Sequence, residues 1–300
     1  MSKFLGIFFG MLSAVAYGTN PLFGVRLIRA GFPVDSMMFW RFFGAAVLLA
    51  PVALFSERGG LRVPLRAVGW LALLGALFAF SAEALFWSFT KMSAGVASTL
   101  LFSYPIFTAL IMSLFFGEKF GLAVFSSIFL SVAGVAAIAL DGAELSVDFL
   151  GSVFVVLSAL SYAFYMVIIK KASLLAGIGG LKLTLWVLGL ASVFTFAKCA
   201  VAGGVAAPQT ASEILDSCGL ALIPTAVSIT AIAYSVKYAG PTVAAVLGAF
   251  EPLTAVSLSV VFLGESCTAN LVAGIVLIVS AVVILAFSDC GKTPKPDFRG

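Results

Sequence analysis

The stretch FLGIFFGMLSAVAY at residues 4–17 recurs as FLGSVFVVLSALSY at residues 149–162, with eight identities in fourteen positions. A second match follows, because twelve residues between Val96 and Ala139 are repeated 147 positions later. Pro105 thus corresponds to Pro252. The chain is therefore an internal duplication, with a first repeat at 1–141, a second at 142–288 and a tail at 289–300.

Composition places both repeats in a membrane. Of the 300 residues, 62% are hydrophobic and 10% charged, against roughly 45–50% and about 25% in soluble domains. Runs of about 20 apolar residues fit membrane-spanning helices and exclude the alternating strands of a β-barrel. Ten such runs are present: 4–25, 36–55, 67–89, 94–116, 120–140, 150–169, 183–203, 219–236, 241–263 and 268–287.

The repeats are predicted to be inverted. Each holds five helices, and since five is an odd number, the second copy enters the membrane from the opposite side. Inverted repeats related by a two-fold axis in the membrane plane are typical of secondary transporters, with the substrate site near the midplane. We expect an all-α integral membrane protein in which ten helices surround a central cavity.

The basic residues predict the orientation. With a cytoplasmic N-terminus, twelve Lys and Arg residues fall in inner segments and four in outer ones. By the positive-inside rule both termini are cytoplasmic, and the loop at 141–149 is external. We expect a multi-pass protein of the plasma (inner) membrane.

The segments VASTLLFSYPIFTALIMSLFFGEKF at 96–120 and TVAAVLGAFEPLTAVSLSVVFLGES at 242–266 each carry a mid-helix proline followed by Phe-x-Gly-Glu. Together with the repeated Leu-Ser-Ala-x-x-Tyr helix, they resemble the drug/metabolite transporter superfamily and its ten-helix EamA-type branch. The resemblance implies export of amino acids, other metabolites or cationic drugs. It favours amino acids, including the aromatic ones handled by YddG-like exporters.

Helical spacing collects polar and aromatic residues into rows on six helices. These rows predict the lining of the substrate site. The candidates for substrate binding are Tyr17, Asn20, Glu83, Trp87, Ser103, Tyr104, Tyr162, Tyr165, Tyr234 and Glu251. Taken singly, the Ser, Thr and Tyr residues have an alternative interpretation as helix-packing groups or interface anchors.

Glu83 and Glu251 are the strongest candidates. A carboxylate near the middle of a membrane is costly, so it should face a cavity, pair with a cation or be protonated. Arg41 is a candidate cation, but we expect it to snorkel to the outer surface, about five residues away. Pro105 and Pro252 each remove a helical hydrogen bond, which predicts a hinge in each repeat.

Other functional classes are disfavoured by what the sequence lacks. There is no histidine, and the four cysteines form no C-x-x-C pair, so we expect no metal, cofactor or catalytic residue and no enzyme activity. No phosphate-binding G-x-x-x-x-G-K-[ST] motif is present, which argues against ATP-driven transport. A channel and a dimeric multidrug pump remain alternatives. The expected partners are a small-molecule substrate and the lipid bilayer, with no nucleic acid, for a protein acting as a monomer.

Overall fold

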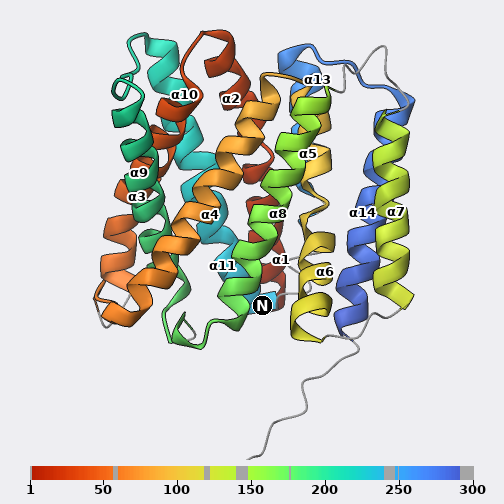
Figure 1. Cartoon of the computed structure of the whole chain (residues 1–300), viewed down its shortest axis with the longest axis horizontal. Coiled ribbons are helices and arrows are strands. Elements are labelled where there is room, and N and C mark those ends of the chain that lie inside the picture. Colours follow the sequence, from red (N-terminus) through yellow and green to blue (C-terminus); the bar gives the residue numbers. More distant parts are fainter. Residues whose placement is uncertain are drawn as a thin grey trace, which may run out of the picture.

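The computed structural model describes residues 2–56, 60–117, 122–139, 148–175, 177–239, 247–248 and 250–290. Within these ranges every regular element is a helix (Figure 1). The boundary between the repeats, Glu118 and residues 291–300 of the tail lie outside them.

The first repeat contains five apolar segments, two of them broken near their middle. Its helices are α1 (Ser2–Tyr17), α2 (Asn20–Arg29), α3 (Val34–Ser56), α4 (Leu65–Phe89), α5 (Ala94–Leu101), α6 (Tyr104–Phe116) and α7 (Leu122–Ala139). The α1–α2 and α5–α6 pairs each form one segment, at 4–29 and 94–116.

The second repeat follows the same plan. Its elements are α8 (Phe149–Lys171), the short 3₁₀ helix η1 (Ser173–Leu175), α9 (Gly180–Val201), α10 (Ala211–Ala221), the π-helix η2 (Leu222–Val227), α11 (Ser228–Ala239), α13 (Phe250–Leu263) and α14 (Ala269–Cys290). Elements α10, η2 and α11 form one continuous helical segment.

Ten segments in all fit membrane crossings. Seven described segments are long and apolar enough to span a bilayer, and three shorter apolar helices lie in α7, α13 and α14. The start of α1 and the end of α14 lie at the same face of the bundle (Figure 1), as an even number of crossings requires. The ten-helix prediction is therefore confirmed, although the beginning of the ninth run lies outside the described residues.

Contacts between the repeats obey a pseudo-two-fold symmetry. Helix α1 packs on α11, and its counterpart α8 packs on α4. In the first pair the Ser13 hydroxyl donates to the Ser228 carbonyl at 2.9 Å, and the Ser228 hydroxyl donates to the Ser13 carbonyl at 3.0 Å. In the second pair the Ser158 hydroxyl donates to the Ser81 carbonyl at 2.7 Å, and the Ser81 hydroxyl donates to the Ser158 carbonyl at 3.0 Å. Since buried hydroxyls in apolar surroundings need a partner, these bonds fix the register of both helix pairs.

Two tryptophans repeat the symmetry nearer the ends of the bundle. The Trp40 indole Nε1 of α3 donates to the Ala206 carbonyl at 2.9 Å, and that of Trp186 in α9 donates to the Leu61 carbonyl at 2.8 Å. The α9–α10 and α3–α4 loops that accept these bonds lie at opposite faces of the bundle (Figure 1). Each repeat therefore holds a loop of the other, at opposite ends of the molecule, as inverted repeats require.

Prolines account for the interrupted helices. Pro21 has no N–H for the Tyr17 carbonyl, and the Asn20 amide donates to that carbonyl instead, at 2.8 Å. In η2, Pro224 likewise leaves the Leu220 carbonyl without its helical donor. The Thr225 hydroxyl supplies the missing bond at 2.9 Å. At both of these prolines a polar side chain thus satisfies the freed carbonyl, as helices in lipid require.

Pro105 and Pro252 both lie in the first turn of a helix. Helix α5 ends at Leu101, and α6 begins at Tyr104 with Pro105 in its first turn. Pro252 lies in the first turn of α13, and most of the residues before α13 lie outside the described ranges. A hinge function for the two prolines stays a prediction.

Glu265 joins the two repeats at the end of α13. Its carboxylate accepts the Ser93 hydroxyl at 2.8 Å and the backbone N–H groups of Ala94 and Gly95 at 2.7 and 2.9 Å. The negative charge therefore sits on the N-terminus of α5, where unpaired N–H groups and the helix dipole favour it. Glu265 acts as an N-terminal cap supplied by the other repeat.

We expect Glu265→Ala to lower the free energy of unfolding by about 1–2 kcal/mol, as the loss of a good helix cap does. Glu265→Gln should lose less, because an amide oxygen still accepts hydrogen bonds. Thermal denaturation of the detergent-solubilised protein measures the effect. An unchanged melting temperature in both variants would show that the cap contributes nothing to stability.

Candidate functional site

Three of the predicted tyrosines form one cluster between the repeats. Tyr104 of α6 meets Tyr162 of α8 edge to face, with ring centroids 4.7 Å apart. Tyr162 and Tyr165 are stacked at 5.5 Å, and Phe78 of α4 packs against both. All three tyrosines keep part of their surface accessible although they lie on interior helix faces. The cluster therefore presents aromatic surface and hydroxyl groups near the middle of the bundle.

Tyr17 and Glu251 border this cluster. Tyr17 is the last residue of α1, and Glu251 lies in the first turn of α13. Glu251 interacts electrostatically with Tyr17, Tyr104 and Tyr162. Its side chain is partly buried and forms no hydrogen bond or ion pair with the described residues. A carboxylate thus lies near three phenol groups, which come from three helices of both repeats.

Arg41 is buried, so the prediction that it snorkels to the outer surface is wrong. Only 1% of the residue is exposed. Its Nε donates to the Thr225 hydroxyl at 2.9 Å, and its guanidinium carbon lies 5.4 Å from the Phe86 ring centroid and 5.8 Å from that of Phe42. The Tyr17 phenol interacts with the same guanidinium. Thr225, Phe86 and Tyr17 come from other helices and hold the cation inside the bundle.

Asn20 and Ser103 serve the helix breaks beside the cluster. The Asn20 Nδ2 bonds the Tyr17 carbonyl, while its buried Oδ1 has no hydrogen-bond partner among the described residues. The Ser103 hydroxyl donates to the Leu100 carbonyl at 2.6 Å. Both side chains thus satisfy backbone groups where α1 and α5 end, and Asn20 retains a free acceptor.

Glu83 has a cation partner in another part of the molecule. Its carboxylate lies 2.9 Å from the Lys198 Nζ of α9, and the same Nζ lies 2.8 Å from Asp35 of α3. The three residues stand near the ends of their helices. This ion triad matches the structural pairing that the sequence left open for Glu83.

Trp87 and Tyr234 lie away from the contacts described for the tyrosine cluster. Trp87 is 39% exposed, so it presents its ring to the surroundings. The Tyr234 ring stacks on Phe9 at 5.2 Å, in the interface of α1 and α11. A substrate role for these two residues stays a prediction.

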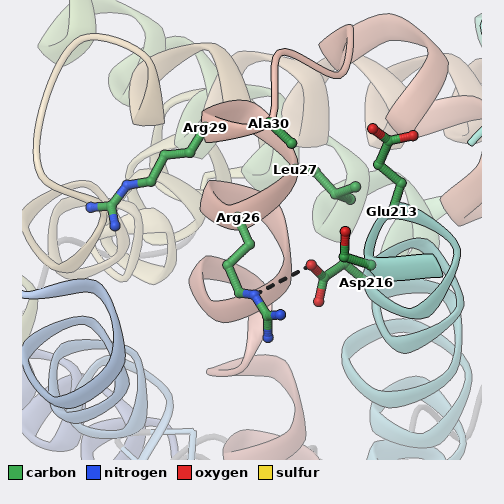
Figure 2. Close-up of a pocket in the computed structure, with 7 residues that line it drawn as sticks. Arg26, Leu27, Arg29, Ala30, Glu213 and Asp216 are labelled. Carbon is green, nitrogen blue, oxygen red and sulfur yellow. Dashed lines mark ion pairs between the residues drawn. The ribbon is translucent and has the colours of Figure 1, made fainter. Parts of the chain in front are cut away.

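A separate charged pocket of about 270 Å³ lies between α2 and α10. Arg26 points across it towards Asp216 and forms an ion pair at 3.3 Å, while Arg29 extends in another direction (Figure 2). The Arg29 Nη2 donates to the Leu263 carbonyl at 2.9 Å. Glu213 accepts the backbone N–H groups of Gln209 and Thr210 and so caps α10. The charged groups of this pocket are thus largely engaged with one another or with helix ends.

Comparison with protein families gives one match for each repeat. Residues 4–140 and residues 149–287 both match the EamA-like transporter family. The two matched ranges agree with the repeats read from the sequence and cover most of the chain.

Three proteins named as transporters are similar over most of their length. The uncharacterized transporter YdfC of Bacillus subtilis is 28% identical, over 85% of this chain and 83% of its own. An uncharacterized transporter of Clostridium kluyveri is 26% identical, with 93% and 92% covered. One of Archaeoglobus fulgidus is 28% identical, with 91% and 93% covered.

One solved crystal structure of a protein has the same fold. It superposes with a TM-score of 0.67 at 17% identity and covers 94% of this chain and 96% of its own. At this identity the likeness concerns the arrangement of the helices alone.

Proposed function

Since the chain belongs to the EamA-like transporter family and is a multi-pass membrane transporter, we propose that it is a secondary exporter of small organic solutes. Its substrates are amino acids, aromatic ones included, and it works by alternating access. It resides in the inner membrane with both termini in the cytoplasm. The excess of basic residues in the inner segments supports this orientation.

The arrangement of Glu251 against Tyr17, Tyr104 and Tyr162 carries the substrate proposal. A carboxylate held among aromatic rings fits an ammonium group, which gains both charge pairing and cation–π attraction. The rings fit an aromatic or aliphatic side chain, with about 0.5–1.5 kcal/mol for each aromatic pair. A zwitterionic amino acid with an apolar side chain offers both features in one small molecule.

Alternating access is supported by the way the repeats are built. The α1–α11 and α8–α4 pairs are each fixed by reciprocal serine bonds, so each pair is suited to move as a unit. Pro105 and Pro252 lie in the first turn of a helix at equivalent positions of the two repeats. We assign them as the hinges about which the pairs rock around the central site.

Purified protein in liposomes should take up radiolabelled phenylalanine with saturation and should exchange it in counterflow. A continuously open pore cannot produce counterflow. Tyr162→Ala should weaken uptake several-fold, because it removes the ring at the centre of the cluster. Phe164→Ala is the matched control, since Phe164 lies on the same helix and is 36% exposed. Equal uptake by both variants would remove the tyrosine cluster from the substrate site.

A further inference from the structure

We propose that Arg41 binds the carboxylate of the transported amino acid, opposite the ammonium site at Glu251. This assignment rests on the proposed function and names the anionic half of the same site. Sequence reasoning had placed Arg41 at the outer surface, and no substrate role follows from its position in the sequence.

The guanidinium has unused hydrogen-bonding capacity in the interior. Arg41 is among the largest fully buried side chains of the described residues. Its Nε is bonded to Thr225, whereas its buried Nη2 has no hydrogen-bond partner there. Because guanidinium donors are strong and cannot be deprotonated, an unpaired Nη group is a site for an acceptor.

No acidic group neutralises this cation among the described residues. The groups that interact with its charge are the Tyr17 phenol and the faces of Phe42 and Phe86, and it forms no salt bridge with a described residue. By contrast, Arg26 pairs with Asp216. A buried charge is costly unless it is paired and hydrogen-bonded, and cation–π contacts recover only part of that cost. An incoming carboxylate would supply the missing charge and the missing acceptor.

Thr225 explains why the cation is held in place. Its hydroxyl proton is committed to the Leu220 carbonyl that Pro224 leaves free. The hydroxyl oxygen is therefore an acceptor only, and it takes the Nε proton of Arg41. Since π-helical turns are frequent at functional sites, η2 gives the guanidinium a fixed contact at Nε, while Nη2 has no hydrogen-bond partner among the described residues.

The cation and the anion share one neighbour. Tyr17 interacts with both Arg41 and Glu251, so both charges lie near the same phenol. Both charges also break the pseudo-symmetry. Arg41 of the first repeat is matched by Val187 in the second, and Glu251 of the second repeat is matched by Tyr104 in the first. A symmetric scaffold with one cation and one anion fits a dipolar ligand in a single orientation.

The first arm of the test uses the unmodified transporter and three probes: phenylalanine, phenylalaninamide and phenethylamine. The amide and the amine keep the ring and the ammonium group but lack the carboxylate. We expect each to compete with phenylalanine uptake at least about tenfold more weakly than phenylalanine does, because a buried donor left unpaired is penalised. This arm needs no variant and so does not depend on how a substitution folds.

The second arm compares Arg41→Gln and Arg41→Lys. Arg41→Gln should reduce competition by phenylalanine at least about tenfold while leaving competition by phenylalaninamide nearly unchanged, so that the preference for a carboxylate disappears. Arg41→Lys should retain part of the preference, since it keeps the charge without the bidentate geometry. Size-exclusion profiles and melting temperatures establish that the variants are folded.

The outcomes separate the two proposals. The carboxylate role alone would be overturned if the protein transports phenylalanine but phenylalaninamide competes as well as phenylalanine does. It would also be overturned if Arg41→Gln weakens competition by phenylalanine and by phenylalaninamide equally. Absence of saturable amino acid uptake by the unmodified protein, with uptake of other solutes, would overturn the proposed substrate class and the carboxylate role together. Selective loss of the carboxylate preference supports both.

Discussion

Glu251→Gln is expected to lower saturable uptake of a zwitterionic amino acid by at least about tenfold, while the protein remains folded. The change keeps the size of the side chain and its ability to accept a hydrogen bond, and it removes the negative charge. The Glu251 side chain forms no ion pair or hydrogen bond with the described residues, so its replacement breaks no side-chain bond within them. The charge is then free to act on a substrate ammonium group.

Glu265→Gln is the matched control for this experiment. It makes the same chemical change at a carboxylate that caps α5 through Ser93, Ala94 and Gly95. We expect this variant to lose stability and to keep its substrate affinity, which is the reverse of the pattern for Glu251→Gln. Normal uptake by Glu251→Gln would exclude a charge-pairing role and leave Glu251 as a packing residue.

Gly24→Val is expected to destabilise the protein by about 2 kcal/mol and to impair transport, because it overfills the core beside Arg41. A Cβ atom at Gly24 would overlap with Cε1 of Phe86. Phe86 is completely buried and forms the closer of the two ring contacts with the Arg41 guanidinium. Its ring has to move to admit the new side chain, and that movement disturbs the cation.

The control for Gly24→Val is Gly189→Val in the middle of α9. A Cβ atom there meets nothing within 4 Å. We expect this variant to match or slightly exceed the stability of the unmodified protein, since glycine is a poor helix former. Melting temperatures in detergent and phenylalanine uptake in liposomes are the measurements. Equal melting temperatures and equal uptake in the two variants would show that the close packing of α2 against Phe86 contributes nothing to stability.

The helices and their symmetry were predictable because the signals are local. Runs of 20 apolar residues and a repeat at an offset of about 145 residues require no knowledge of tertiary contacts. The break before Pro105 and the place of Pro252 in the first turn of α13 follow from proline chemistry in the same way. The missing backbone donor at Pro224 could be predicted in the same way. The π-helical turn and the hydrogen bond from the Thr225 hydroxyl to the Leu220 carbonyl could not.

The site was only partly predictable, since helical spacing shows which residues share a face and not which neighbour that face meets. Arg41 illustrates the limit, because snorkelling was inferred from its distance to the end of its own helix. Thr225, which holds it, lies 184 residues further along the chain. For the same reason the sequence could not predict the contact between Glu83 and Lys198, which are 115 residues apart.

The indole bonds of Trp40 and Trp186 give the protein its own spectroscopic reporters. The chain has four tryptophans. Trp70 and Trp87 are each 39% exposed, whereas Trp40 and Trp186 donate their Nε1 protons to loop carbonyls at opposite faces of the bundle. Bonded indole protons exchange slowly with deuterated water, and their resonances depend on the accepting carbonyl. A motion that loosens one face would therefore speed the exchange of one indole proton and leave the other as an internal reference.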